Sequence, residues 1–150
     1  MQNAGAGGSG SEPNLGANRP VMQSRHPEAD RLDQWEQDFN EMSQHFARLE
    51  RSLLEVQNLR VFIVTERNAR LRQLHQDATQ LRQRAARAQT DVQRVELNVS
   101  NVDNRELRRA YAQHARIARG LEELIKDVDH ATPSIEYQLT QFKPPSAPLQ

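Results

Sequence analysis

The sequence predicts an all-α protein built as an elongated coiled coil of long helices. Apolar side chains recur at alternating steps of three and four residues over most of the chain, which is the spacing of a helix that lies along another helix. Neither glycine nor proline occurs between residues 28 and 119. Hydrophobic residues make up only 36% of the 150 residues and the mean hydropathy is -0.87, which favours long solvated helices over a broad globular core.

Residues 1–26 are predicted to be a disordered tail rich in Gly, Pro and Ser. They contain five of the six glycines and two of the prolines. Their larger apolar side chains are too few to bury the surface that would offset the entropy lost on ordering. The helical coiled-coil region is therefore expected to span residues 27–142, and residues 143–150 are expected to form a second disordered tail.

The first helix is expected to begin near Pro27, because proline suits the first helical turn and the acidic residues that follow suit the positive end of the helix dipole. Its apolar stripe is interrupted at Arg60, and a second stripe begins at Leu71 in a changed phase. We favour one continuous helix over residues 28–99, because no glycine or proline forces a turn. The alternative is a hairpin that turns near residues 60–68 and pairs two antiparallel helices.

A break is expected over residues 100–104, where Ser, Asn and Asp side chains compete with the helix for backbone hydrogen bonds. Asp103 stands three residues before a glutamate, which is the spacing of a capping box, so a further helix is predicted over residues 104–131. Pro133 should end that helix and start a short one over residues 133–142.

The apolar stripes are interpreted as the surface that binds partner helices. The first stripe is wide and aromatic, whereas the second is slim, because its alanines admit close approach of another backbone. His114 falls on the last stripe, where we interpret it as a polar residue that sets the register or contacts the partner. The positions assigned to the partner-helix interface are Leu32, Trp35, Phe39, Met42, Phe46, Leu49, Leu53, Val56, Leu71, Leu74, Ala78, Leu81, Ala85, Ala88, Val92, Val95, Val99, Val102, Leu107, Ile117, Leu121, Leu124 and Val128.

Charge is distributed unevenly along a chain that is neutral as a whole. Residues 28–55 carry a net charge of -5, and residues 60–94 carry a net charge of +5. Complementary charges of this kind select partner and orientation, either within the chain or between subunits. The Arg-rich 60–94 stretch also suggests an alternative function, an adaptor that binds nucleic acid or anionic lipid. Its arginines are scattered around the helix with Phe62 as their one aromatic neighbour, so nucleic acid is disfavoured as a partner.

No pattern in the sequence indicates catalysis, a metal or a cofactor. The five histidines are never three or four residues apart, cysteine is absent, and no phosphate-binding or nucleophile motif occurs. We therefore expect no enzyme, no metal, no cofactor and no small-molecule substrate. The lack of a signal peptide and of any long apolar run predicts no membrane span and a cytoplasmic location, with the nucleus as the second choice.

The expected function is that of a non-enzymatic structural subunit or scaffold, which assembles with other helical chains into a hetero-oligomer. The layout is similar to small subunits of organelle-positioning, tethering, kinetochore or transcription-mediator assemblies, and it does not distinguish between them. A second interpretation is a self-contained three-helix bundle over residues 28–131, which resembles a spectrin-like repeat in its dimensions and in carrying Trp35 on its first helix. In that bundle the apolar stripes would face one another and not a partner.

Overall fold

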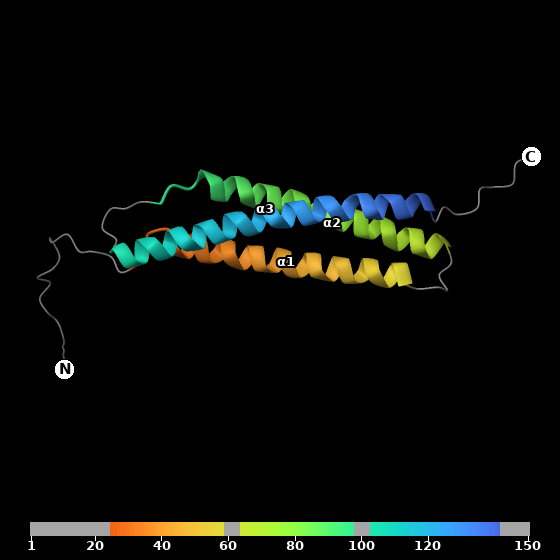
Figure 1. Ribbon diagram of the computed structural model, residues 1–150, viewed down its shortest axis with the longest axis horizontal. Helices are drawn as coiled ribbons and strands as arrows, with labels where there is room; N and C mark the ends of the chain where they lie inside the picture. Colours follow the sequence, from red (N-terminus) through yellow and green to blue (C-terminus); the bar gives the residue numbers. More distant parts are fainter. Residues whose placement is uncertain (1–24, 59–63, 98–102, 142–150) are drawn as a thin grey trace, which may run out of the picture.

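The computed structural model describes residues 25–58, 64–97 and 103–141, and in these ranges the chain forms three helices in one bundle (Figure 1). The helices are α1 (Ala29–Asn58), α2 (Val64–Arg94) and α3 (Asn104–Gln141). Successive helices run in opposite directions, so α1 and α3 are parallel and α2 is antiparallel to both. The first and last described residues therefore lie at opposite ends of the bundle. The prediction of an all-α fold is confirmed.

The prediction of one continuous helix over residues 28–99 is wrong. Helix α1 ends at Asn58, the next helix begins at Val64, and the two pack against each other. The chain thus reverses direction close to the 60–68 hairpin that was the alternative, although residues 59–63 lie outside the described residues. The physical reason is burial. A straight rod would leave both apolar stripes in water, whereas a hairpin covers them at a gain of roughly 25 cal/mol per Å² of apolar surface.

The core runs along the bundle axis, where the apolar stripes of the three helices meet. Leu32, Leu71 and Val128 are fully buried, and each comes from a different helix. Ala78 and Ala85 are also fully buried on α2, and α2 and α3 are the most extensively packed pair of helices. Small side chains let two helix backbones lie close together, because no long side chain separates them. The neighbour that uses these alanines belongs to the same chain.

Polar groups cap the first turns of α1 and α3. The Nδ1 atom of His26 accepts a hydrogen bond from the Glu28 amide at 3.0 Å, and the His26 carbonyl accepts one from the Ala29 amide at 2.9 Å. A carboxylate oxygen of Asp103 accepts a hydrogen bond from the Glu106 amide at 2.7 Å. These contacts satisfy amides that have no partner inside the helix. The predicted cap of α3 is confirmed.

Helix α2 ends at Arg94, five residues before the predicted end of the long helix. The Nε2 atom of His114 lies 2.7 Å from the carbonyl oxygen of Val92, and because a carbonyl only accepts, Nε2 is the donor. The same carbonyl accepts a hydrogen bond from the Val95 amide at 3.3 Å, so the bond from His114 is a second one at the last turn of α2. His114 therefore contacts another helix of its own chain.

Helix α3 continues through Pro133, so the prediction of two separate helices over residues 104–131 and 133–142 is wrong. Proline removes a backbone hydrogen bond and costs a helix interior about 3 kcal/mol. Pro133 is exposed, whereas Ile135 is fully buried two residues later and Leu139 packs against the core. Burial of these apolar side chains offsets the cost, and the helix therefore continues.

Candidate functional site

Most of the predicted partner-helix positions lie inside the bundle. The buried positions are Leu32, Met42, Phe46, Leu49, Leu53, Val56, Leu71, Leu74, Ala78, Leu81, Ala85, Val92, Ile117, Leu121, Leu124 and Val128. The half-buried positions are Trp35, Phe39, Ala88, Val95 and Leu107. Val99 and Val102 lie outside the described residues. Most stripe positions are thus covered by their own chain, so a surface for a partner has to be sought where the bundle stays open.

Charged side chains link the helices across the outside of the bundle. The ion pairs between helices include Arg84–Glu41, Arg82–Asp129 and Arg116–Glu36, with N–O distances between 2.6 and 3.2 Å, and His75 Nε2 lies 2.9 Å from a carboxylate oxygen of Glu136. Arg84–Glu41 joins the basic stretch 60–94 to the acidic stretch 28–55, so complementary charges meet within the chain. Such partly exposed pairs contribute little to stability one by one. Two arginines of the basic stretch are thereby engaged with carboxylates of the same molecule.

The Arg82–Asp129 pair has the most favourable geometry of these contacts. Arg82 Nε donates to one carboxylate oxygen at 2.6 Å, and its NH2 group donates to the other at 3.2 Å. The hydrogen bond from Arg82 lowers the pKa of Asp129, and Asp129 raises the pKa of Arg82 in return. The pair therefore fixes one side of the α2–α3 contact in its charged form.

A second carboxylate is held at the end of the bundle where α1 begins. Gln113 Nε2 on α3 donates to Asp33 at 2.8 Å, and Arg25 donates to the same carboxylate at 2.6 Å. The hydrogen bond from Gln113, followed by that from Arg25, lowers the pKa of Asp33. These contacts join α1 and α3 at this end.

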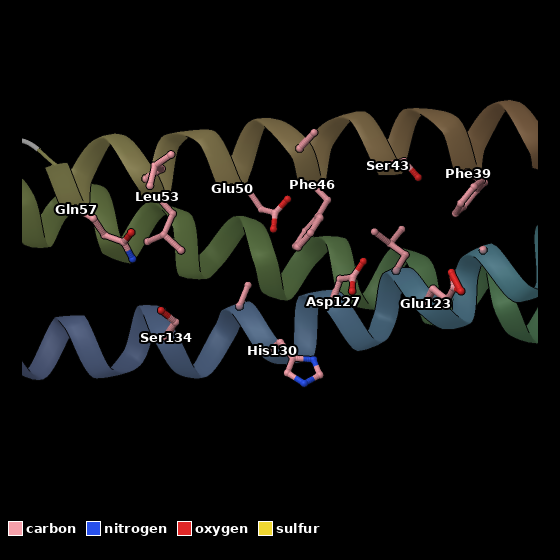
Figure 2. Close-up of a pocket in the computed structure, with 15 residues that line it drawn as sticks. Phe39, Ser43, Phe46, Glu50, Leu53, Gln57, Glu123, Asp127, His130 and Ser134 are labelled. Carbon is pink, nitrogen blue, oxygen red and sulfur yellow. The ribbon is translucent and has the colours of Figure 1, made fainter.

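Farther along the bundle, α1 and α3 leave a groove between them, and α2 lies behind it (Figure 2). Its volume is about 780 Å³. Phe39, Phe46 and Leu53 extend from α1 into the gap, and Leu124 contributes from α3. Leu54 lies at the edge with 55% of its surface exposed. The complete lining is Phe39, Ser43, Phe46, Ala47, Glu50, Leu53, Leu54, Gln57, Gly120, Glu123, Leu124, Asp127, His130, Ala131 and Ser134.

The groove is open because the side of α3 that faces α1 has few apolar residues to close it. That side presents Glu123, Asp127 and Ser134 to the groove, while the apolar stripe of α3 is directed to the core. On α1, the positions beside the stripe are small, as at Ser43 and Ala47. Two helices close tightly only where side chains from both fill the space between them. Between α1 and α3 few side chains fill this space, and α1–α3 is the least extensively packed pair of helices.

Gly120 marks the end of the groove where the ring of Phe39 contacts α3 directly. A Cβ atom placed on Gly120 would lie 2.5 Å from Phe39 Cζ, which is closer than van der Waals contact allows. The ring of Phe39 therefore rests on the bare backbone of α3. This contact, together with the Arg116–Glu36 pair, sets the register of the two parallel helices.

Three carboxylates line the groove, and no lysine or arginine does. Glu50 lies on α1, and Glu123 and Asp127 lie on α3. All three are exposed, and among the described residues none of them forms an ion pair. The groove thus combines an apolar floor with acidic, unpaired rims.

Four predicted stripe positions, Phe39, Phe46, Leu53 and Leu124, form the apolar floor of the groove, whereas its small and acidic residues lie beside the stripes and were not predicted. The available signal was Gly120, the one glycine in the predicted helical region, together with the small residues at positions 43 and 47. A glycine inside a helix lowers helical stability unless a close approach of another group requires it.

Comparison of the chain with protein-family models, with curated proteins and with solved structures gives no match. Within the described ranges, no three His, Asp or Glu side chains are arranged to hold a metal ion. None of the three helices, taken over these ranges, is both long and apolar enough to cross a membrane.

Proposed function

We propose that this protein is a non-enzymatic structural subunit whose groove between α1 and α3 receives a helix of another protein. The groove itself supports the proposal. Its apolar floor is continuous with the core, and its two walls are parallel helices, so a further helix laid along it would complete a four-helix arrangement. Docking of an amphipathic helix into an apolar groove is a common form of protein recognition.

The length of the groove fits a helix of four to five turns. On α1 it runs from Phe39 to Gln57, and on α3 it runs from Gly120 to Ser134. At 1.5 Å per residue these spans are about 27 and 21 Å. A partner helix of that length offers three or four apolar side chains on one edge, at the i, i+3/i+4, i+7 spacing that such grooves accept.

The proposal keeps assembly with other helical chains as the function but changes the surface that performs it. Most stripe positions pack inside the bundle, and the open face combines the stripe residues Phe39, Phe46, Leu53 and Leu124 with residues beside the stripes. The adaptor function based on the Arg-rich stretch loses support, because Arg82 and Arg84 are engaged with Asp129 and Glu41.

A site-specific cross-link tests the proposal. A photoreactive phenylalanine derivative is placed at Ala47, which lines the groove, and in a matched variant at Gln83, an exposed α2 residue that does not. We expect an adduct from position 47 in the cells that produce the protein and none from position 83. The cross-linked segment should carry apolar residues at steps of three and four, as a docked helix requires.

A synthetic peptide of that segment completes the test. It should bind the purified full-length chain, and Ala47→Trp should abolish binding while leaving the thermal unfolding transition in place, because a bulky side chain fills the groove from an exposed position. The proposal fails if position 47 gives no adduct beyond that of position 83, or if the peptide still binds after Ala47→Trp.

A further inference from the structure

We infer that the helix received by the groove is basic, with an apolar edge flanked on both sides by lysine or arginine. This inference rests on the proposed function and names the chemistry of the partner. It is carried by the three carboxylates of the groove, by the absence of Lys and Arg from its described lining, and by the spacing of the acids along it.

The acids lie on successive turns and on both rims. Glu123 and Asp127 are four residues apart on α3, which separates them by about 6 Å along the axis. In the register set by Phe39 and Gly120, Glu50 on the opposite rim is level with the region of His130, as Figure 2 shows. A docked helix would therefore meet two acids on one flank and a third acid on the other flank, about one turn farther on.

Two other acids of α3 show what Glu123 and Asp127 lack. Asp129 and Glu136 lie on the same helix as the α3 rim, and each is paired with a side chain of α2. Glu123 and Asp127 have no such partner among the described residues. A helix that covered them without supplying cations would remove water from unpaired carboxylates, which costs binding energy. A basic helix would supply the missing partners, so the rims select against neutral and acidic helices.

The same charges disfavour other occupants of the groove. Phosphates of nucleic acid and anionic lipid headgroups would be repelled by the acidic rims. A partner protein with a cationic amphipathic helix satisfies both the apolar floor and the rims, which is the combination on which the inference depends.

Two designed peptides test the inference. Both have 18 residues and the same leucines at steps of three and four, and they differ in carrying lysine or glutamate at the flanking positions. Binding to the full-length protein is measured by fluorescence anisotropy. We expect the lysine peptide to bind at least about tenfold more tightly than the glutamate peptide, with an affinity that falls as salt is added.

A matched pair of triple variants separates the groove from general charge effects. Glu50→Gln, Glu123→Gln and Asp127→Asn together should raise the Kd of the lysine peptide by about tenfold, since each exposed ion pair contributes a small factor. The control carries Glu66→Gln, Asp91→Asn and Glu122→Gln, three exposed acids outside the groove with the same change in net charge. We expect the control to bind almost as tightly as the unmodified protein.

The outcomes distinguish the inference from the proposed function. Equal binding of both peptides, lost in Ala47→Trp, would overturn the basic partner and leave groove docking in place. Equal weakening by the two triple variants, or lysine-peptide binding that survives Ala47→Trp, would place the contact outside the groove and overturn the inference. Failure of both peptides to bind overturns the inference as well. In that case the proposed function is still tested separately by the cross-link at position 47. Self-association of the purified chain that Ala47→Trp abolishes would assign the groove to a second copy, which also contradicts a basic partner.

Discussion

The contact between α2 and α3 is closed, whereas the contact between α1 and α3 is open along most of its length, although both contribute to one core. On the closed side, α2 presents the fully buried Ala78 and Ala85, and the charges at its edge are paired. On the open side, α1 presents aromatic rings, and α3 presents carboxylates without partners among the described residues.

The difference shows that the apolar stripe alone does not decide how tightly two helices close. All three helices bear a stripe of similar spacing, and most of the described positions of each stripe are buried. The fully buried alanines let α2 and α3 approach, whereas between α1 and α3 the small Ser43 and Ala47 and the unpaired acids of α3 leave space unfilled. An open groove is thus left where the flanking residues do not fill the space between the helices.

Leu81→Asp should break the closed side completely. Leu81 is 1% exposed, so the substitution buries an unpaired carboxylate in the core, and we expect a loss of more than about 4 kcal/mol in the free energy of unfolding. Leu54→Asp, at the edge of the groove, should change this free energy by less than about 0.5 kcal/mol. Urea titration followed by circular dichroism measures both, and equal midpoints for the two variants would contradict the assignment of inner and outer faces.

Ala85→Leu and Ala47→Leu compare the two helix contacts with the same chemical change. Ala85 is fully buried, and overpacking there should cost about 1 to 3 kcal/mol. Ala47 lies beside open space in the groove, and the same change should fall within about 0.5 kcal/mol of the unmodified protein. The measurement is again chemical unfolding, and a similar loss for both would show that the groove is already filled.

Gly120→Ala tests the close contact between Phe39 on α1 and the backbone of α3. Alanine favours the helix by up to about 1 kcal/mol, yet its Cβ atom would displace the ring of Phe39, so we expect a net destabilisation of about 1 kcal/mol. In a Phe39→Ala background the clash is gone, and Gly120→Ala should then stabilise. A double-mutant cycle from thermal unfolding gives the coupling, and additive effects would mean that the ring does not rest on Gly120.

Asp129→Asn should have the smallest effect, because its ion pair with Arg82 is half-exposed. The pKa of Asp129 is lowered in the folded protein, so the stabilisation by this pair is present above the unfolded value near 3.8 and is lost as the pH falls through the folded value. The variant should therefore be slightly less stable at pH 7, and the difference should disappear in strong acid. Asp127→Asn, on the groove side, is the control, and we expect no loss of stability from it at pH 7.

The core positions could be predicted from the sequence, because the buried face of a helix repeats every three to four residues whether it packs against its own chain or against a partner. Leu71, Leu81 and Val128 were all chosen from that period, and all are buried. For the same reason, the apolar stripes do not show whether the helix that buries them belongs to the same chain or to a partner. The interruption at Arg60 and the change of phase at Leu71 were the available signs of a hairpin. The lack of Gly or Pro argued against a turn, but a turn does not require either residue.

Neither the groove nor the continuation of α3 through Pro133 could be predicted from the sequence, and the reasons differ. The groove depends on how Ser43 and Ala47 align with Glu123 and Asp127, and that alignment exists once the helices have packed. Pro133 was expected to end a helix on local grounds. The tertiary packing of Ile135 outweighed that local preference.

Because the bundle has an odd number of antiparallel helices, the described chain begins at one end of it and stops at the other. Arg25 and Gln141 lie at opposite ends, separated by roughly the length of α3, which is about 57 Å for 38 residues. A pulling force between Arg25 and Gln141 would act along the helix axes. The helices would then have to slide past one another before any one of them could detach from the bundle.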